Sequence, residues 1–326
     1  MEVIKSNTEI LKYKRVIVKD LWKQLESESD AVEALWSIKL GDAGFCCRSC
    51  KGTKYWKHSS RSEIRECSSC HRQHRVRAGT LFEHSKLSLL VWLRAIGYVM
   101  QDKRGVSALQ LKRIMGLPSM ATSWLMLMKI RKALVERDSI YKLSGTVELD
   151  GAYFVNDHKL KKEKPYRNHT KAAVFVAVEQ KSWVDEAGRP KMRAGFAKVM
   201  LDPAGQETRS NLVKFVRQSI KPTSLVKTDG KHKNLPDVRT DSRAVSGDKR
   251  SVQAHLPWVH KFISNAKRWI LGTHHGRISS KYLPYYLGEY TYRFNRRHDP
   301  KSLYARALSA CILSAPIRAH ALSGNA

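Results

Sequence analysis

The chain has 326 residues and 42% of them are hydrophobic, so it is long enough for two or three folding units with real cores and is not a disordered tail. Lysine and arginine number 60 against 29 acidic residues, a formal net charge of +31 that predicts a nucleic-acid partner; the alternatives are a solvated basic surface or a ribosome-associated role. There is no run of about 18 apolar residues, which argues against a membrane partner, and the first residues lack a signal-peptide core, which favours a cytoplasmic location.

Helical periodicity marks the beginning of the chain. Apolar residues between positions 21 and 36 recur mostly three or four apart, namely Leu21, Trp22, Leu25, Ala31, Leu35 and Trp36. This spacing predicts one or two helices in an N-terminal segment that we place at 1–43.

Five of the six cysteines lie between positions 46 and 70, which is unlike a disulfide framework and typical of a metal site. Two CxxC pairs are separated by 16 residues, a spacing that predicts a zinc ribbon over 44–82 with four thiolate ligands: Cys47, Cys50, Cys67 and Cys70. Cys46 should point away from the ion. The alternative is four buried cysteines that are paired only in sequence. Basic residues surround the pairs and suit phosphate contact, namely Arg48, Lys51, Lys54, Arg72 and Arg75.

The region 83–142 has a helix-turn-helix pattern. We expect a buried helix over 85–101, a short helix that begins after Ser107 and ends near Gly116, and a longer helix over about 120–134. The basic residues late in the last helix would contact DNA, namely Lys129, Arg131 and Lys132. The centre of that helix, 124–128, is very apolar, so the alternative is a core or dimerisation helix.

An α/β domain is predicted from 143 to 300, followed by a C-terminal tail over 301–326. The expected strands are 146–150, 172–178, 195–200 and 224–229. The expected helices are 206–220, 258–271 and 280–297, with polar, basic loops at 156–170 and 230–254.

Two aspartates stand at the ends of predicted strands, Asp150 and Asp229. Carboxylates on neighbouring strands can share two divalent metals about 4 Å apart, which activate a nucleophile and stabilise the leaving oxygen. This is the arrangement of RNase H-like nucleotidyltransferases. The alternative is that an aspartate merely caps a turn.

The C-terminal third carries a longer pattern. A Lys267-Arg268 pair is followed by the stretch 272–275, Gly-Thr-His-His, and by a helix that ends at 293–297 in Arg-Phe-Asn-Arg-Arg. This pattern resembles the ISXO-like transposases of bacterial insertion sequences, the fifteen-ninety-five group. The ribbon, the segment 79–82, the helix-turn-helix and the α/β domain also follow that family's order.

The resemblance implies a catalytic triad of two aspartates and a third residue, commonly Glu. The first two map onto Asp150 and Asp229, and the third, seven residues before Lys267, is His260, with Asn265 as the runner-up. These residues would hold Mg²⁺ or Mn²⁺. The alternative is that His260 contacts phosphate or packs. His260 departs from the family's commoner Glu, and Gly151 departs from the Glu that often follows the first aspartate. The two departures leave open whether this copy is active.

The resemblance also implies a function. The chain would be a bacterial, nucleoid-associated transposase that binds terminal inverted repeats as a dimer or larger assembly on double-stranded DNA and then cleaves and transfers strands. Four C-terminal basic residues would grip phosphates, namely Lys267, Arg268, Arg296 and Arg297, unless they form a solvated basic face. The alternative function is a domesticated DNA-binding regulator, which would need the ribbon and the helix-turn-helix but not the two aspartates.

Overall fold

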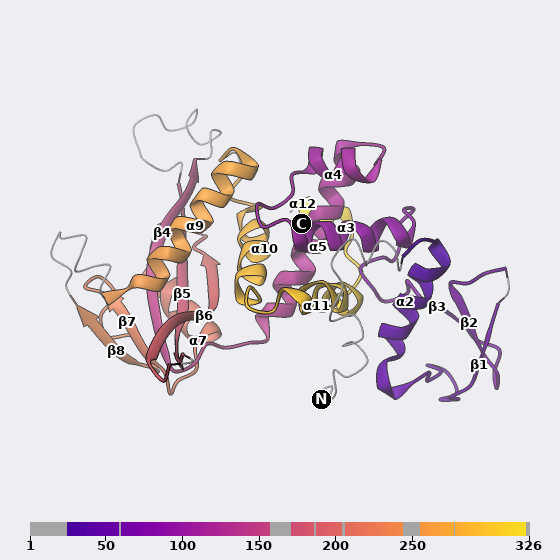
Figure 1. Cartoon of the computed structure of the whole chain (residues 1–326), viewed down its shortest axis with the longest axis horizontal. Coiled ribbons are helices and arrows are strands. Elements are labelled where there is room, and N and C mark those ends of the chain that lie inside the picture. Colours follow the sequence, from indigo (N-terminus) through magenta and orange to yellow (C-terminus); the bar gives the residue numbers. More distant parts are fainter. Residues whose placement is uncertain are drawn as a thin grey trace. The chain divides into compact units, whose positions relative to one another are not determined.

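The computed structural model describes residues 25–58, 60–156, 171–185, 187–203, 206–243, 255–276 and 278–323. The chain forms two compact units, the sheet unit (138–297) and the N-terminal unit, which combines 1–137 with 298–326 (Figure 1). The part of the helical pattern before residue 25 lies outside the described residues, as do residues 157–170 and 244–254 of the two expected basic loops.

The sheet unit is a mixed α/β structure. Its five strands are β4 (Thr146–Asn156), β5 (Lys171–Val184), β6 (Pro190–Leu201), β7 (Leu225–Asp229) and β8 (Arg239–Arg243). They lie in the order β6-β5-β4-β7-β8; β4, β5 and β6 are antiparallel, while β7 is parallel to both β4 and β8. Its helices are α7 (Arg209–Ser219), α9 (Pro257–His274) and α10 (Leu283–Asn295).

Both faces of this sheet are buried. Alternate side chains of a strand point to opposite faces, and β5 supplies Val174, Val176 and Val178 to one core and Phe175 and Ala177 to the other. The first core contains the apolar sides of α9 and α10, and the second contains that of α7. The sheet therefore lies between helical layers, with α9 and α10 on one face and α7 on the other.

Two strands differ from the sequence prediction in ways that affect the site. The strand β4 runs on to Asn156, so Asp150 lies within the strand and not at its end. Its ladder with β7 stops at Leu149, opposite Thr228. Asp150 therefore lies just past the last residue of β4 that pairs with β7, while it still pairs with β5 on the other side. The strand β8 lies within the segment 230–254, which was expected to be a loop. It was not predicted because its polar residues have no alternation of apolar and polar side chains.

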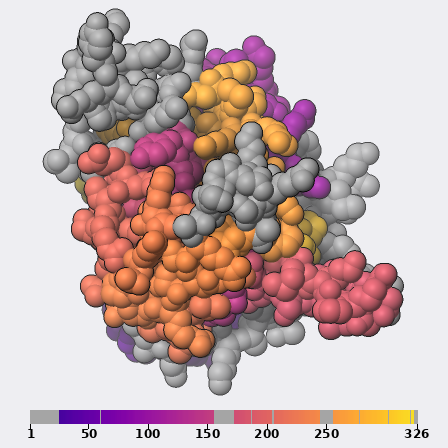
Figure 2. Space-filling view, turned by 90° about the vertical axis from the view of Figure 1, so that its left-hand side faces the viewer, coloured from indigo at the N-terminus to yellow at the C-terminus, as the bar shows by residue number. Residues whose placement is uncertain are grey.

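The hairpin of β5 and β6 extends beyond the packed part of the sheet. Its ladder continues to the pair Val184 and Pro190, and its tip projects from the face seen in Figure 2 (pink, at the right). Trp183 and Met192 are exposed there. This hairpin end is therefore surface and not core.

The N-terminal unit is a small ribbon with helices. The ribbon strands are β1 (Tyr55–Lys57), β2 (Ile64–Cys67) and β3 (Gln73–Arg75), all antiparallel. The helices are α2 (Glu28–Leu40), the short η2 (Gly41–Ala43), α3 (Leu89–Gln101), α4 (Ala108–Met115), most of α5 (Met120–Ser139), α11 (Pro300–Leu313) and α12 (Ala319–Ser323). No helix in the described ranges is long and apolar enough to cross a membrane.

The start and end of α4 follow its sequence signals. The Ser107 hydroxyl accepts a hydrogen bond from the Gln110 N–H at 3.2 Å, and Gly116 adopts the left-handed conformation that ends the helix. The C-terminal segment expected as a tail is instead mostly helical. Its α11 packs on α2 and α3, and the Leu81 N–H donates to the carbonyl of Cys311 at 3.2 Å.

Candidate metal centres

The four cysteines of the two CxxC pairs meet in the ribbon. The sulfurs of Cys47, Cys50, Cys67 and Cys70 all lie within 4.8 Å of one another, and two of the pairs are 3.5 Å apart. A tetrahedral zinc ion with Zn–S bonds of about 2.3 Å would hold its sulfurs about 3.8 Å apart. Cys46 is exposed and outside the group. The cluster therefore fits a zinc ribbon.

The same turn is built twice around this cluster. The N–H of Lys51 donates to the Cys47 carbonyl, and the N–H of His71 donates to the Cys67 carbonyl, each at 3.0 Å. Both donors have a positive φ, 64° and 58°. Backbone N–H groups inside the first turn, above all that of Cys50, lower the pKa of the Cys47 thiol. The first turn thus favours the thiolate form of Cys47 that metal ligation requires.

A second cluster lies at the edge between β4 and β7. Ligand atoms of Asp150, Asp229 and His232 all lie within 4.8 Å of one another. The parallel register, with Leu149 opposite Thr228, brings the next residues of the two strands side by side. The strand pairing therefore unites two carboxylates that are far apart in sequence.

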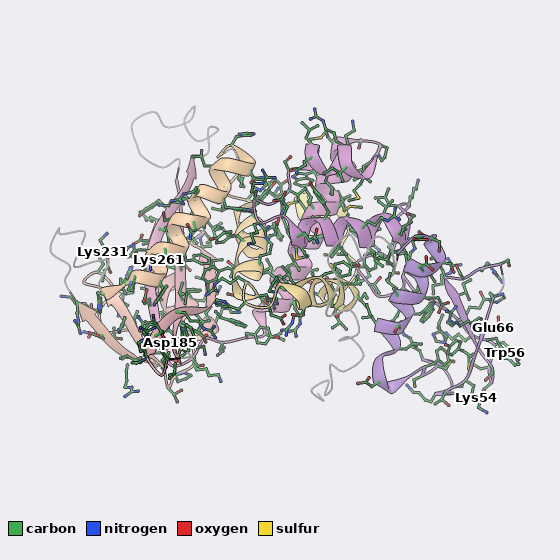
Figure 3. All side chains as sticks on the ribbon, in the orientation of Figure 1. Lys54, Trp56, Glu66, Asp185, Lys231 and Lys261 are labelled. Carbon is green, nitrogen blue, oxygen red and sulfur yellow. The ribbon has the colours of Figure 1, made fainter. Side chains whose placement is uncertain are left out.

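The electrostatics of this cluster favour a cation. Burial and then the negative charge of Asp229 raise the pKa of Asp150 to about 7. The charge of Lys231, labelled in Figure 3, acts in the opposite sense but is a lesser effect. Two adjacent carboxylates in a partly buried place repel each other unless a cation lies between them, so the pair is suited to a divalent ion.

His260 approaches the same carboxylates from α9. Its Nδ1 is 3.8 Å from Oδ2 of Asp150, and burial lowers its pKa, which favours the neutral ring that can bind a metal. Its Nε2 is buried and has no hydrogen-bond partner in the described part of the chain. Asn265, further along α9, is exposed. The identity of the third catalytic residue stays a prediction.

Glu148 holds the beginning of α9 in place. Its buried carboxylate accepts hydrogen bonds from the N–H groups of Trp258 at 2.7 Å and Val259 at 2.8 Å, and from the Gln180 side chain at 2.6 Å. The helix has no side-chain cap of its own. A carboxylate there satisfies free N–H groups and suits the positive end of the helix dipole. Because Glu148 and Asp150 share one strand, this contact fixes His260 relative to the aspartates.

We expect Glu148→Ala to lower the free energy of unfolding by at least about 2 kcal/mol, because each buried polar group left without a partner costs about 1–3 kcal/mol. Amide hydrogen exchange in the peptide 255–262 should also speed up, since the first turn of α9 loses its cap. Urea denaturation and exchange mass spectrometry measure the two effects. Asp237→Asn, at an exposed carboxylate of the same unit, is the control; equal effects of the two variants would refute the capping role.

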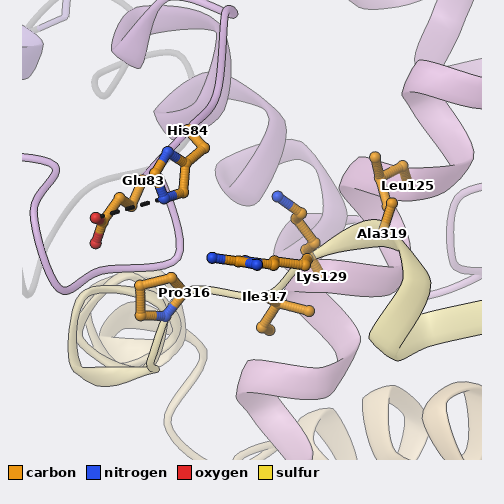
Figure 4. A pocket seen from close by; sticks show the side chains of 8 residues that line it. Glu83, His84, Leu125, Lys129, Pro316, Ile317 and Ala319 are labelled. Atoms are coloured by element: carbon orange, nitrogen blue, oxygen red, sulfur yellow. Dashed lines mark ion pairs between the residues drawn. The ribbon is translucent and has the colours of Figure 1, made fainter. Parts of the chain in front are cut away.

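The basic residues expected to contact DNA from α5 are partly internal. Arg131 is 1% exposed and lies by the carbonyl of Val106 at 3.5 Å. Lys129 lines a pocket of about 400 Å³ with Glu83 and His84 (Figure 4), and burial lowers its pKa. Lys132 is more exposed and lies 3.9 Å from Glu136. We therefore retain only Lys132 of these three among the proposed DNA contacts.

The C-terminal basic residues separate in the same way. Arg296 is buried and forms an ion pair with Asp138 at 2.6 Å, while Arg297 donates to the carbonyls of Phe294 at 2.7 Å and Gly195 at 3.3 Å. Lys267 and Arg268 are exposed on α9. These are the basic residues of the pattern that can face a phosphate backbone.

Sequence analysis did not select two further groups near the aspartates, His232 and Glu207. His232 lies only three residues after Asp229, so a search for ligands just beyond the strand end would have found it. Glu207 precedes α7 and is brought near by tertiary packing alone, with its Oε2 3.7 Å from Nε2 of His232. No sequence spacing indicates that contact.

The sheet unit is an α/β domain with a carboxylate cluster where two parallel strands part. Residues 142–295 match the ISXO2-like transposase domain, and the match includes both aspartates and His260. The sheet unit therefore carries an ISXO2-like transposase domain. Neither the curated proteins nor the solved structures contain a match to the chain.

Proposed function

We propose that the chain is a DNA transposase whose sheet unit has an RNase H-like fold and cuts and joins DNA strands with divalent metal ions. One observation carries the proposal: Asp150 and Asp229 lie side by side at the end of their ladder, with His260 3.8 Å from Asp150. Three antiparallel strands extended by two parallel ones, with acidic residues on the first and fourth, support the fold.

Asp150, Asp229 and His260 would hold Mg²⁺ or Mn²⁺, which supplies a polarised nucleophile and a stabilised leaving oxygen. In the first step a water oxygen bonds to the phosphorus at the transposon end. The bond from phosphorus to the 3′-oxygen breaks, and that oxygen takes up a proton. In the second step the freed 3′-hydroxyl loses its proton and its oxygen bonds to a target phosphorus. The bond from that phosphorus to the 3′-oxygen of the target strand breaks, and the released oxygen takes up a proton. The chain's own residues hold the ions and orient the reacting phosphate.

DNA would be held by surfaces from both units. The zinc ribbon and the pair of α4 and α5, joined by a short turn as in a helix-turn-helix, would recognise the terminal inverted repeats. Lys132 on α5 and the exposed pair Lys267 and Arg268 on α9 would contact phosphates. Joining two ends requires at least a dimer on DNA.

A cleavage assay tests the proposal. The full chain is incubated with end-labelled duplex that carries the element's terminus, with Mg²⁺, with Mn²⁺, or with a chelator. We expect a nick at the terminus with either metal, no product with the chelator, and none with Asp150→Asn or Asp229→Asn. A wild-type protein that binds the terminus but never cleaves it would refute the catalytic function.

DNA binding should depend steeply on salt, because the charge of +31 points to many phosphate contacts. For six to ten contacts, affinity falls by about 10³–10⁵ between about 50 and 200 mM salt. Fluorescence anisotropy with labelled duplex gives the slope. Lys267→Ala with Arg268→Ala should lower the slope by about 2, one for each contact removed. Lys214→Ala, an exposed lysine on α7, should leave it unchanged; a flat wild-type response would contradict the phosphate contacts.

A further inference from the structure

Gly151 leaves room for another carboxylate beside Asp150. A Cβ atom at position 151 would lie 2.3 Å from Cδ and Oε1 of Glu207 and 2.8 Å from its Oε2, closer than real Cβ contacts come. The backbone there is not in the positive-φ region, so its conformation does not demand glycine. The Glu207 carboxylate therefore occupies the space that any other side chain at 151 would fill.

Glu207 reaches the aspartates from the α7 side of the sheet. Side chains alternate along β4; Ala152 and Phe154 belong to the core with α9, so Asp150 faces α9 and Gly151 faces α7. Glu207 lies just before α7, its side chain is 16% exposed, and its negative charge adds to the rise in the pKa of Asp150. The Glu207 carboxylate thus lies next to Gly151 and to the His232 ring.

His232 supplies an independent indication of a ligand site. The residue is 7% exposed, and its Nε2 is buried without a hydrogen-bond partner in the described ranges. A ring nitrogen of His232 lies within 4.8 Å of the ligand atoms of both Asp150 and Asp229, and its Nε2 is 3.7 Å from Oε2 of Glu207. Buried polar atoms are rarely left unpaired, and a cation bound among these carboxylates would give this nitrogen a partner.

The strand arrangement explains how ligands from both faces can meet. The paired part of β4 and β7 stops at Leu149 and Thr228, and β7 ends one residue later at Asp229, whereas β4 continues to Asn156. There His260 comes from the α9 face, whereas Glu207 and His232 come from the α7 side, where His232 packs by the ring of Phe175. The aspartate pair lies between the two groups.

We propose that Glu207 and His232 ligate a divalent cation together with Asp150 and Asp229, so that the centre holds two ions, one toward each face of the sheet. Gly151 permits this by leaving the space for Glu207. The proposal deepens the proposed function and rests on it for the role of the ions, but it concerns binding and can be measured without DNA. Carboxylate oxygens with an imidazole nitrogen suit Mn²⁺, which is the probe.

Mn²⁺ titration of the zinc-loaded full chain, by calorimetry and by electron paramagnetic resonance of free Mn²⁺, tests the proposal. The wild type should bind two ions. Glu207→Gln, nearly isosteric, should lose one ion or bind it at least tenfold more weakly. Gly151→Ala should do the same although it removes no ligand, because the added methyl group displaces Glu207. The matched controls are Asp237→Asn and Gly272→Ala, whose added methyl meets open space; both should bind like the wild type.

The outcomes separate the two proposals. If the wild type and the controls bind Mn²⁺, Asp150→Asn does not, and Glu207→Gln binds as many ions as the wild type with equal affinity, then the role of Glu207 is wrong and the proposed function stands. If the wild type binds no Mn²⁺, both fail. Should Gly151→Ala not fold, Glu207→Gln and His232→Asn still decide, since both keep the size of the side chain close to the original.

Discussion

Cys47→Ser should release one zinc ion per chain and unfold the ribbon while the sheet unit stays folded. The ribbon has almost no core of its own: its apolar cluster is Phe45, Cys47 and Cys67, with Leu40 and Tyr55 at its margin. A structural zinc ion contributes about 10–16 kcal/mol of apparent binding free energy, far more than such a cluster can supply. Elemental analysis gives the zinc content, and hydrogen exchange in β1–β3 and in β4–β6 reports each unit separately.

The control for this change is the neighbouring thiol. Cys46 is exposed and lies outside the cluster, so Cys46→Ser should keep the zinc and the protection of the ribbon strands. DNA affinity should fall for Cys47→Ser and not for Cys46→Ser. Wild-type protein without zinc, or equal loss in the two variants, would refute the ribbon as a zinc site.

Local spacing carried much of the fold prediction. The two CxxC pairs specify their turns within four residues each, and Ser107 and Gly116 mark both ends of α4. Apolar runs predicted the strands β4, β5, β6 and β7 and the helices α7, α9 and α10, though not the full lengths of all of them. These signals can be recognised in the sequence because each depends on residues that are close together along the chain.

What the sequence did not reveal depends on contacts between distant segments. Nothing local shows that Arg131 is internal or that Arg296 forms an ion pair with Asp138. The charge of an arginine suggests that its side chain contacts solvent or DNA. Only the tertiary packing shows that these two side chains are buried. The β8 strand lies at the sheet edge with polar residues on both faces, and α11 occupies the beginning of the segment where a tail was expected.

The candidate site divides along the same line. Asp150 and Asp229 could be selected from the sequence because each comes at the end of a short apolar run. That they lie next to each other depends on the parallel register of β4 and β7. The resemblance supplied His260, since no strand or spacing rule leads to a residue on α9. Glu207 has no local signal, and it becomes visible only when a side chain is imagined on Gly151.

His260→Ala should abolish strand cleavage while leaving binding to the transposon end intact, because the proposed end-binding surfaces lie in the ribbon, α4 and α5. The expected loss in cleavage rate is about 10²–10³-fold or more, the scale seen when one group that stabilises transition-state charge is removed. A neutral imidazole is a softer ligand than a carboxylate, so the wild type should prefer Mn²⁺ to Mg²⁺. His260→Glu should retain or raise activity with Mg²⁺, since it restores an oxygen ligand at a position from which Nδ1 now approaches Oδ2 of Asp150 at 3.8 Å.

The discriminating partner of this experiment is Asn265→Ala. Asn265 is exposed and lies five positions further along α9, beyond one helical turn from His260. It should cleave like the wild type in single-turnover assays with either metal, and filter binding should give equal affinities for all three variants. If His260→Ala cleaves normally and Asn265→Ala is inactive, then Asn265 is the third residue. The contact of His260 with Asp150 would in that case be a packing contact, and the catalytic face of α9 would be the one that carries Asn265.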